Sequence, residues 1–153
     1  MQSVDTDTRY VRPGRMTAAM NWAIRRLVRI GVSVWGAREL RLVGRKSGQL
    51  RTNVVNPLPL AGEQYLVAPR GTTEWVRNLR AADGGELRLG RRVESFRAVE
   101  LDDDAKLPVL RSYLERWKWE VGQFFQGVGP DAPDSEIARI APDYPVFRID
   151  VVR

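Results

Sequence analysis

The sequence contains no cysteine and no histidine. Without cysteine, the chain has no disulfide bonds, no thiolate metal ligands and no thiol nucleophile. Without histidine, it lacks the commonest general base and the commonest metal ligand. Zinc sites, histidine-dependent serine triads and haem with a histidine ligand are therefore excluded. Any chemistry that the chain supports is expected to come from a bound cofactor.

Long apolar runs are also missing. No window reaches the roughly 18 uninterrupted apolar residues of a transmembrane helix, and the N-terminus shows no signal-peptide pattern. We therefore expect a cytoplasmic protein. The length of 153 residues and the hydrophobic content of 43% suit a single domain over residues 1–153, with residues 1–13 as a flexible tail.

Positive charge, in contrast, is abundant. The formal net charge is +6 and the pI is about 10.3, so the surface attracts anions such as phosphorylated cofactors or acidic lipids. The basic residues are spread along the chain, without an RNA-recognition signature or a long Lys/Arg block. We expect no nucleic-acid partner, and the sequence leaves the oligomeric state open.

A basic amphipathic helix is predicted over residues 15–34, where apolar residues recur at helical spacing and arginines cluster on the other side. The apolar residues are Met16, Met20, Ala23, Ile24, Leu27, Val28, Ile30 and Val34, and the arginines are Arg25, Arg26 and Arg29. Two interpretations stay open. Either the helix packs on the domain with a solvated basic face, or it lies on the anionic inner face of the plasma membrane.

The rest of the chain predicts an α+β fold. Strand-like runs cover residues 39–43, 52–60, 64–68, 86–89, 93–101 and 146–152. Helices are expected from a cap at Thr73 to residue 82 and from Asp102 or Asp103 to residue 125, followed by a Gly/Pro/Asp-rich loop over residues 127–135. Six strands in meandering hairpins with inserted helices indicate a small, mostly antiparallel barrel. No G-x-G-x-x-G motif suggests a Rossmann site.

The most informative motif is the run Gly44-Arg45-Lys46-Ser47-Gly48-Gln49-Leu50-Arg51, between two predicted strands. Glycine lets backbone N–H groups turn toward a ligand, Lys46 supplies a point charge, and Arg45 and Arg51 supply planar forks that match phosphate oxygens. A hairpin tip of this kind either holds a phosphorylated cofactor or is simply a solvated turn.

A second motif begins where the third predicted strand ends, at Ala68-Pro69-Arg70-Gly71. The helix that follows places Trp75, Asn78 and Leu79 at positions i, i+3 and i+4, which share one face. Trp gives a flat surface and Asn gives both donors and an acceptor, so the face suits an aromatic ring system. Trp and Leu at this spacing also suit an ordinary core.

Together, Gly44-Arg45-Lys46-Ser47-Gly48-Gln49-x-Arg51 and Trp75-x-x-Asn78-Leu79 resemble the deazaflavin-dependent nitroreductase family of actinobacterial split β-barrel proteins. The resemblance covers residues 40–101 well and the rest loosely. It implies a split β-barrel fold and binding of coenzyme F-420, an 8-hydroxy-5-deazaflavin, with FMN as the alternative cofactor.

The resemblance also implies roles by position. The phosphate and polyglutamate tail of the coenzyme would contact Arg45, Lys46, Ser47, Gln49 and Arg51. The ring system would lie near three further segments. The first contributes Val54 and Asn56, and the second contributes Ala68, Pro69, Arg70 and Gly71. The third contributes Trp75 and Asn78.

The implied activity is hydride transfer from reduced deazaflavin to a planar quinone-like or nitroaromatic acceptor. Either Tyr113 or water would supply the proton. Two departures from the family leave the substrate open: the loop before Trp75 is short, and the segment before the last strand lacks the family's tyrosine pattern. The alternative is a protein on the same fold that binds deazaflavin, flavin or lipid without turnover.

Overall fold

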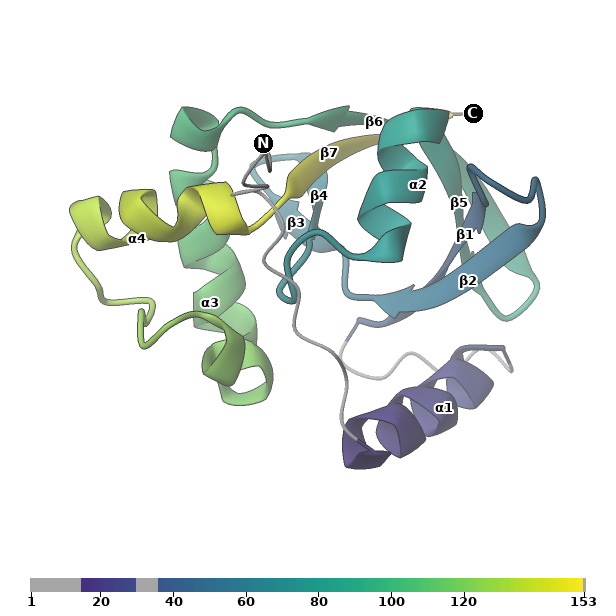
Figure 1. Ribbon diagram of the computed structural model, residues 1–153, viewed down its shortest axis with the longest axis horizontal. Coiled ribbons are helices and arrows are strands. Elements are labelled where there is room, and N and C mark those ends of the chain that lie inside the picture. The colour runs from purple at the N-terminus through teal and green to yellow at the C-terminus, as the bar shows by residue number, and fades with distance from the viewer. Residues whose placement is uncertain (1–14, 30–35, 153) are drawn as a thin grey trace, which may run out of the picture.

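The computed structural model describes residues 15–29 and 36–152, which form a curled antiparallel sheet with helices around it (Figure 1). The predicted tail, residues 1–13, and the predicted helix end, residues 30–34, lie outside the described residues. No helix in the described part of the chain combines the length and the apolar character needed to cross a membrane.

The sheet has seven strands in the order β2-β1-β5-β6-β7-β4-β3, and all neighbouring pairs are antiparallel. The strands are β1 (Arg38–Val43), β2 (Leu50–Val55), β3 (Leu58–Leu60), β4 (Glu63–Val67), β5 (Gly84–Leu89), β6 (Arg92–Glu100) and β7 (Val146–Val151). The predicted α+β split-barrel fold is confirmed, with seven strands where we expected about six.

The extra strand arises because the run 52–60 is not one strand. It breaks at Asn56-Pro57, and its two halves, β2 and β3, lie at opposite edges of the sheet. Val55 and Leu58 are three residues apart and therefore at most ~11 Å from each other. Seven strands in a flat sheet would hold the two edges ~29 Å apart. The short connection thus requires the sheet to curl into an open barrel.

Helix α2 (Glu74–Ala82) packs on β1 and β5 and buries Trp75, Val76 and Leu79 against the sheet. Thr73 occupies the N-cap position as expected, although its side chain makes no capping hydrogen bond. Asp83 ends the helix in the left-handed conformation. The glycines that follow allow close packing, because a Cβ on Gly85 would lie 2.4 Å from Leu42 Cδ2.

A second core lies between the sheet and helices α3 (Leu107–Val121) and α4 (Asp134–Ile140). The expected helix start at Asp102 or Asp103 is instead a separate 3-10 turn over Asp103–Ala105, and α3 is kinked at Trp117. The expected loop at 127–135 runs into α4, a helix that we did not predict. The helix has only seven residues, and its few apolar positions are too short a pattern to predict a helix from the sequence.

Helix α1 (Arg15–Arg29) contacts β1, β2 and β5 and buries Ile24 in a small cluster with Ala37. The predicted apolar stripe is only partly right. Ile24 is buried, whereas Ala23, Met20 and Leu27 are exposed. The side chains of Met16 and Val28 are outside the described set.

Candidate functional site

A cavity of about 550 Å³ opens between the β1–β2 hairpin, helix α2 and helix α1. Its volume falls in the range of sites for small ligands. The lining residues are Arg25, Gly44, Arg45, Lys46, Ser47, Leu50, Arg51, Thr52, Asn53, Glu74 and Asn78. Polar and charged side chains dominate this wall, so the cavity suits a charged part of a ligand better than a bare aromatic ring.

The hairpin tip owes its shape to hydrogen bonds within the motif. The Gly44 N–H donates to Gln49 O (2.7 Å), and the Gly48 N–H donates to Gly44 O (2.9 Å). The Gln49 N–H donates to Ser47 Oγ (3.2 Å). Gly48 has a φ of 70°, which glycine adopts without steric cost. These hydrogen bonds close the turn and fix the backbone from which its cations extend.

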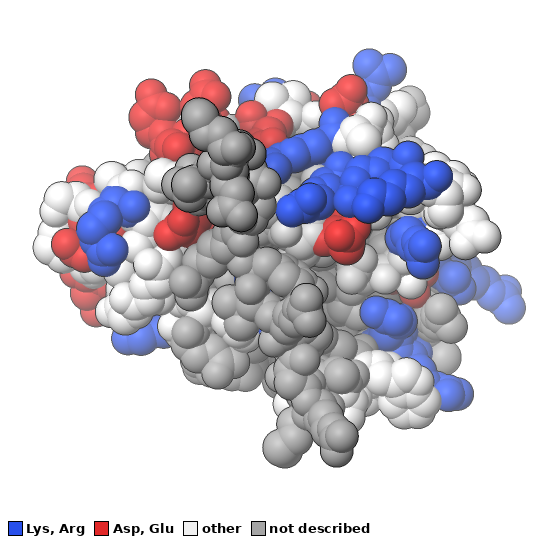
Figure 2. Space-filling view, viewed as in Figure 1, with Lys and Arg blue, Asp and Glu red and all other residues white. Residues whose placement is uncertain are grey.

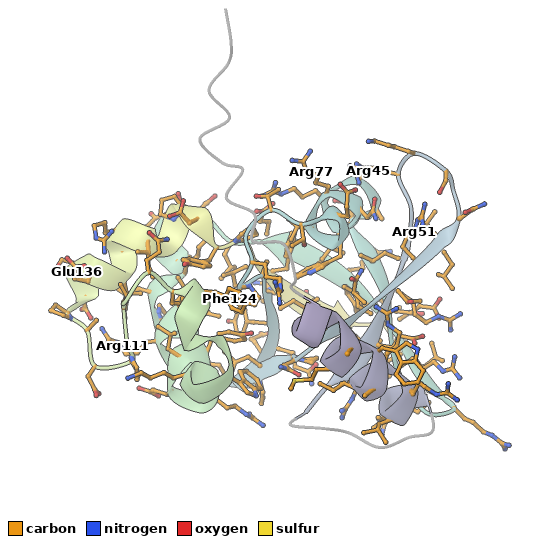
Figure 3. The ribbon with its side chains drawn as sticks, turned by 60° about the horizontal axis from the view of Figure 1, so that its bottom comes forward. Arg45, Arg51, Arg77, Arg111, Phe124 and Glu136 are labelled. Atoms are coloured by element: carbon orange, nitrogen blue, oxygen red, sulfur yellow. The ribbon has the colours of Figure 1, made fainter. Side chains whose placement is uncertain are left out.

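Asn78 ties this tip to helix α2. Its Oδ1 accepts the Arg45 backbone N–H (3.1 Å) and the Arg45 Nη1 (2.8 Å). Glu74, one turn earlier on α2, accepts the same Nη1 at 2.8 Å. The guanidinium of Arg45 is thus shared between two groups of one helix. Figure 3 shows Arg45 at the hairpin beside Arg77 of α2, with Arg51 further along β2.

The electrostatic character of the cavity is strongly positive. Four cations and one carboxylate of the described residues line it, for a net formal charge of +3. The Arg45 hydrogen bond lowers the pKa of Glu74, so this carboxylate is ionised at neutral pH and neutralises part of Arg45. Within the described residues, neither Lys46 nor Arg51 forms a salt bridge. Lys and Arg side chains gather over α2 on the same side of the molecule (Figure 2).

Five of the predicted site residues come together in this cavity: Arg45, Lys46, Ser47, Arg51 and Asn78. Gln49 closes the tip turn instead of lining the cavity. Val54, on β2, packs against the cluster of Ile24 and Ala37, and Asn56 follows β2 in the break before β3. Roles for Gln49, Val54 and Asn56 in ligand binding stay predictions.

The segment from Ala68 to Gly71 lies between β4 and α2 and does not line this cavity. The Ala68 N–H donates to Pro145 O (3.0 Å), and the Gly71 N–H donates to Ala68 O (3.1 Å). Those two donors are occupied within the protein. Pro69 is half-buried, and the Arg70 guanidinium lies 4.6 Å from the centre of the Phe124 ring. Contact of this segment with a cofactor ring stays a prediction.

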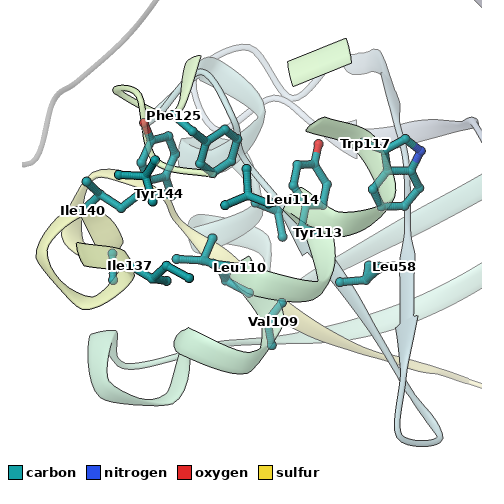
Figure 4. Close-up of a cluster of buried hydrophobic side chains, with 14 residues drawn as sticks. Leu58, Val109, Leu110, Tyr113, Leu114, Trp117, Phe125, Ile137, Ile140 and Tyr144 are labelled. Carbon is teal, nitrogen blue, oxygen red and sulfur yellow. The ribbon is translucent and has the colours of Figure 1, made fainter. Parts of the chain in front are cut away.

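Trp75 and Tyr113 both belong to the hydrophobic core. Trp75 packs on Phe147 with 6.2 Å between ring centres. Tyr113 is 3% exposed and lies between Trp117, at 5.0 Å, and Phe125, at 6.0 Å (Figure 4). Neither residue lines the cavity. Trp75 therefore packs as the core interpretation expects, while a role for Trp75 in cofactor binding and the catalytic role of Tyr113 stay predictions.

Sequence reasoning missed two charged residues of the cavity, Arg25 and Glu74. From the sequence we expected Arg25 on a basic helix face that was either solvated or in contact with a membrane, whereas Arg25 is half-buried and lines the cavity. We assigned Glu74 no place in the site. The i, i+4 spacing of Glu74 and Asn78 is the signal that could have placed both on one face of α2. The described residues contain no cluster of carboxylates suited to a metal ion.

Comparisons with known proteins identify the family and the fold. The model of the F420H(2)-dependent quinone reductase family matches residues 20–123, more than half of the chain. No curated protein matches the sequence.

Among solved structures, the F420-H2 dependent reductase FDR-A is 17% identical, with a TM-score of 0.53 over 75% of this chain and 94% of that one. A conserved hypothetical protein, Rv2991 from Mycobacterium tuberculosis, is 15% identical, with a TM-score of 0.51 over 95% of this chain and 84% of that one. A structure described as a domain-swapped dimer is 18% identical, with a TM-score of 0.54 over 88% of this chain and 99% of that one. At these identities the three structures support the fold.

Proposed function

Because the chain belongs to the F420H(2)-dependent quinone reductase family, we propose that it is an oxidoreductase that passes a hydride from reduced coenzyme F-420 to a quinone-like acceptor. The coenzyme, when bound, supplies the hydride from its deazaflavin ring. The protein's own part is to hold the coenzyme and to orient a planar acceptor. A nitroaromatic compound is a second acceptor of suitable shape.

The observation that carries this proposal is the cationic cavity at the hairpin tip. Lys46 and Arg51 line it without salt bridges among the described residues, and Arg45 is held in place by Glu74 and Asn78. An anionic tail bearing a phosphate and several carboxylates matches a net charge of +3 better than a single phosphate does. These residues therefore fit coenzyme F-420, and they would hold its tail.

We propose water as the proton donor in the reaction. Tyr113 is buried between two aromatic rings in the core and lies outside the cavity lining. Tyr113→Phe removes only the hydroxyl and keeps the ring packing. Turnover by Tyr113→Phe close to that of the parent protein is the expected result, and a large fall in kcat would restore the tyrosine as the donor.

The proposed function is tested by binding first and turnover second. Oxidised coenzyme F-420 is titrated into the protein while its fluorescence is followed, with FMN in a parallel titration. Reduced coenzyme is then mixed with protein and a soluble naphthoquinone, and separately with a nitroaromatic acceptor. We expect tighter binding of the deazaflavin and acceptor-dependent oxidation with the quinone. Tight binding without oxidation by either acceptor would establish the non-catalytic binding protein instead.

We also propose that α1 contacts anionic membrane surfaces. Trp22 is 60% exposed on this helix, and the Arg26 guanidinium lies 5.0 Å from the centre of its ring. An exposed tryptophan beside a cation suits the interface between lipid headgroups and water. Co-sedimentation with phosphatidylglycerol vesicles at low salt, reduced by Trp22→Ala and by high salt, is the expected result. No association at low salt would contradict the contact.

A further inference from the structure

Among the described residues that line the cavity, Arg25 of helix α1 is the one cation from outside the hairpin. It lines the same 550 Å³ cavity as Arg45, Lys46 and Arg51, although it is about twenty residues or more away from them in the sequence. Helix α1 reaches this position by packing on β1, β2 and β5 through Ile24, the residue next to Arg25. Helix α1 thus supplies a wall of the cavity as well as covering part of the sheet.

The Arg25 side chain is incompletely satisfied. Its Nε is buried and has no hydrogen-bond partner in the part of the chain that the structure describes. The Nε atoms of Arg41 and Arg148 are in the same situation, but neither residue lines the cavity. A buried donor without a partner costs free energy, and on a cation this cost is larger. Of these three arginines, only Arg25 is placed where a ligand in the cavity would supply the missing acceptor.

Among the described residues, no carboxylate takes that role. The sequence of α1, residues 15–29, contains no Asp or Glu. Glu74, the one carboxylate among the described lining residues, is bound to Arg45. Arg25 therefore lies at the wall of a cationic cavity, where an anion with several oxygens would be attracted to all of its cations together.

We propose that Arg25 is a further binding residue for the anionic tail of the coenzyme, and that the bound tail connects helix α1 to the β1–β2 hairpin. This inference rests on the proposed function. Arg25 donates hydrogen bonds to phosphate or carboxylate oxygens from helix α1, in addition to the contacts of the tail with the hairpin cations. Binding of the tail then holds α1 on the sheet.

The test compares Arg25→Met with Arg26→Met. Methionine keeps an unbranched stem of similar length, and both variants lower the net charge by one on adjacent residues of one helix. Arg26 is exposed and does not line the cavity. Each variant is titrated with oxidised coenzyme F-420 and with the deazaflavin chromophore that lacks the phosphate and glutamate tail. Amide hydrogen exchange over residues 19–29 is measured with and without each ligand.

For Arg25→Met we expect a roughly tenfold to hundredfold loss of affinity for the coenzyme, the size of one charge-assisted contact. We expect little change for the tail-free chromophore, and little change with either ligand for Arg26→Met. The coenzyme should slow exchange in α1 of the parent protein and of Arg26→Met, but not of Arg25→Met.

Equal losses in the two variants, or equal losses for the two ligands, would overturn the inference and leave the proposed function intact. A parent protein that does not bind the coenzyme would overturn both.

Discussion

Lys46 stands at the hairpin tip, lines the cavity and forms no salt bridge within the described residues. A charge-assisted contact from Lys46 to the coenzyme tail would contribute about 1.5–3 kcal/mol. We therefore expect Lys46→Ala to weaken coenzyme binding tenfold or more on that scale, as measured by fluorescence titration. Arg77→Ala, which removes a charge from α2 outside the cavity lining, is the matched control. The same loss in both variants would show a general charge effect and no contact.

Substitutions of Asn78 distinguish the contribution of the hydrogen bonds to Arg45 from that of the charge of the cavity. Its Oδ1 accepts two hydrogen bonds from Arg45, and the residue is 5% exposed. Asn78→Ala leaves the Arg45 N–H without this acceptor, so we expect a loss of about 1–3 kcal/mol in unfolding free energy and weaker coenzyme binding. Asn78→Asp keeps the acceptor but adds a negative charge. It should therefore retain most of the stability and still bind the coenzyme poorly.

Thermal melts with and without oxidised coenzyme distinguish these cases, because ligand stabilisation follows affinity. If Asn78→Asp gave the full coenzyme-induced rise in Tm, the charge of the cavity would not matter for binding. If Asn78→Ala melted like the parent protein, the two bonds to Arg45 would contribute little to folding.

Glu74 is the one acidic group among the described lining residues, and it would compete with an anionic ligand for Arg45. Glu74→Gln should tighten coenzyme binding by about twofold to fivefold, the scale of an exposed ion pair. Glu136→Gln, which removes an exposed carboxylate paired with Arg139 on α4, is the control. Weaker binding by Glu74→Gln would mean that orienting Arg45 outweighs the repulsion.

The pH dependence of the same pair has a definite sign. The Arg45 hydrogen bond lowers the pKa of Glu74, so any stability from the pair is present above the ordinary carboxyl pKa and is lost as the pH falls through the lowered pKa. Because the Glu74 side chain is 74% exposed, solvent screening keeps this contribution small.

At the scale of elements, strand β5 begins directly after helix α2 and packs tightly between β1 and β6. A Cβ on Gly85 would lie 2.4 Å from Leu42 Cδ2 and 2.8 Å from Arg41 O, and the latter is backbone that cannot rotate away. We expect Gly85→Ala to destabilise the protein by about 1–3 kcal/mol, measured by urea unfolding. Gly122→Ala, where the nearest atom is Lys118 Cγ at 3.4 Å, should change the stability little. Equal stability of both variants would contradict the tight packing of β5.

For helix α1, the sequence predicted that a helix forms but not which of its residues pack on the sheet. Its helical spacing predicted a helix over residues 15–34, and the structure confirms it for residues 15–29, the part that it describes. Spacing alone did not show which residues face the sheet, because Met20 and Leu27 are exposed beside the buried Ile24. Which α1 residues are buried depends on how the helix packs on β1, β2 and β5. The position of those strands depends in turn on the curl that the connection from β2 to β3 imposes on the sheet.

For the whole molecule, the positive charge predicts how the affinity for the coenzyme depends on salt concentration. The chain carries a net charge of +6, and the cavity carries +3. We expect the affinity for the coenzyme to fall steadily as salt rises, because ions screen attraction at a partly open site. The affinity for the tail-free deazaflavin should stay nearly constant in the same titrations. A salt-independent affinity for the coenzyme would show that its tail does not lie among these cations.

The sequence by itself determined the elements and the chemistry that they can support. Absence of cysteine and histidine excluded whole classes of sites, and period-two and helical patterns located most strands and α2, because these signals are local. The hairpin motif identified Arg45, Lys46 and Arg51 as cations near one another, since they lie within one turn. Only the tertiary structure decided that Asn78 holds Arg45, that Trp75 and Tyr113 pack in the core, and that Arg25 reaches the cavity. Those contacts join residues far apart in the sequence, and the packing of the helices on the curled sheet brings them together.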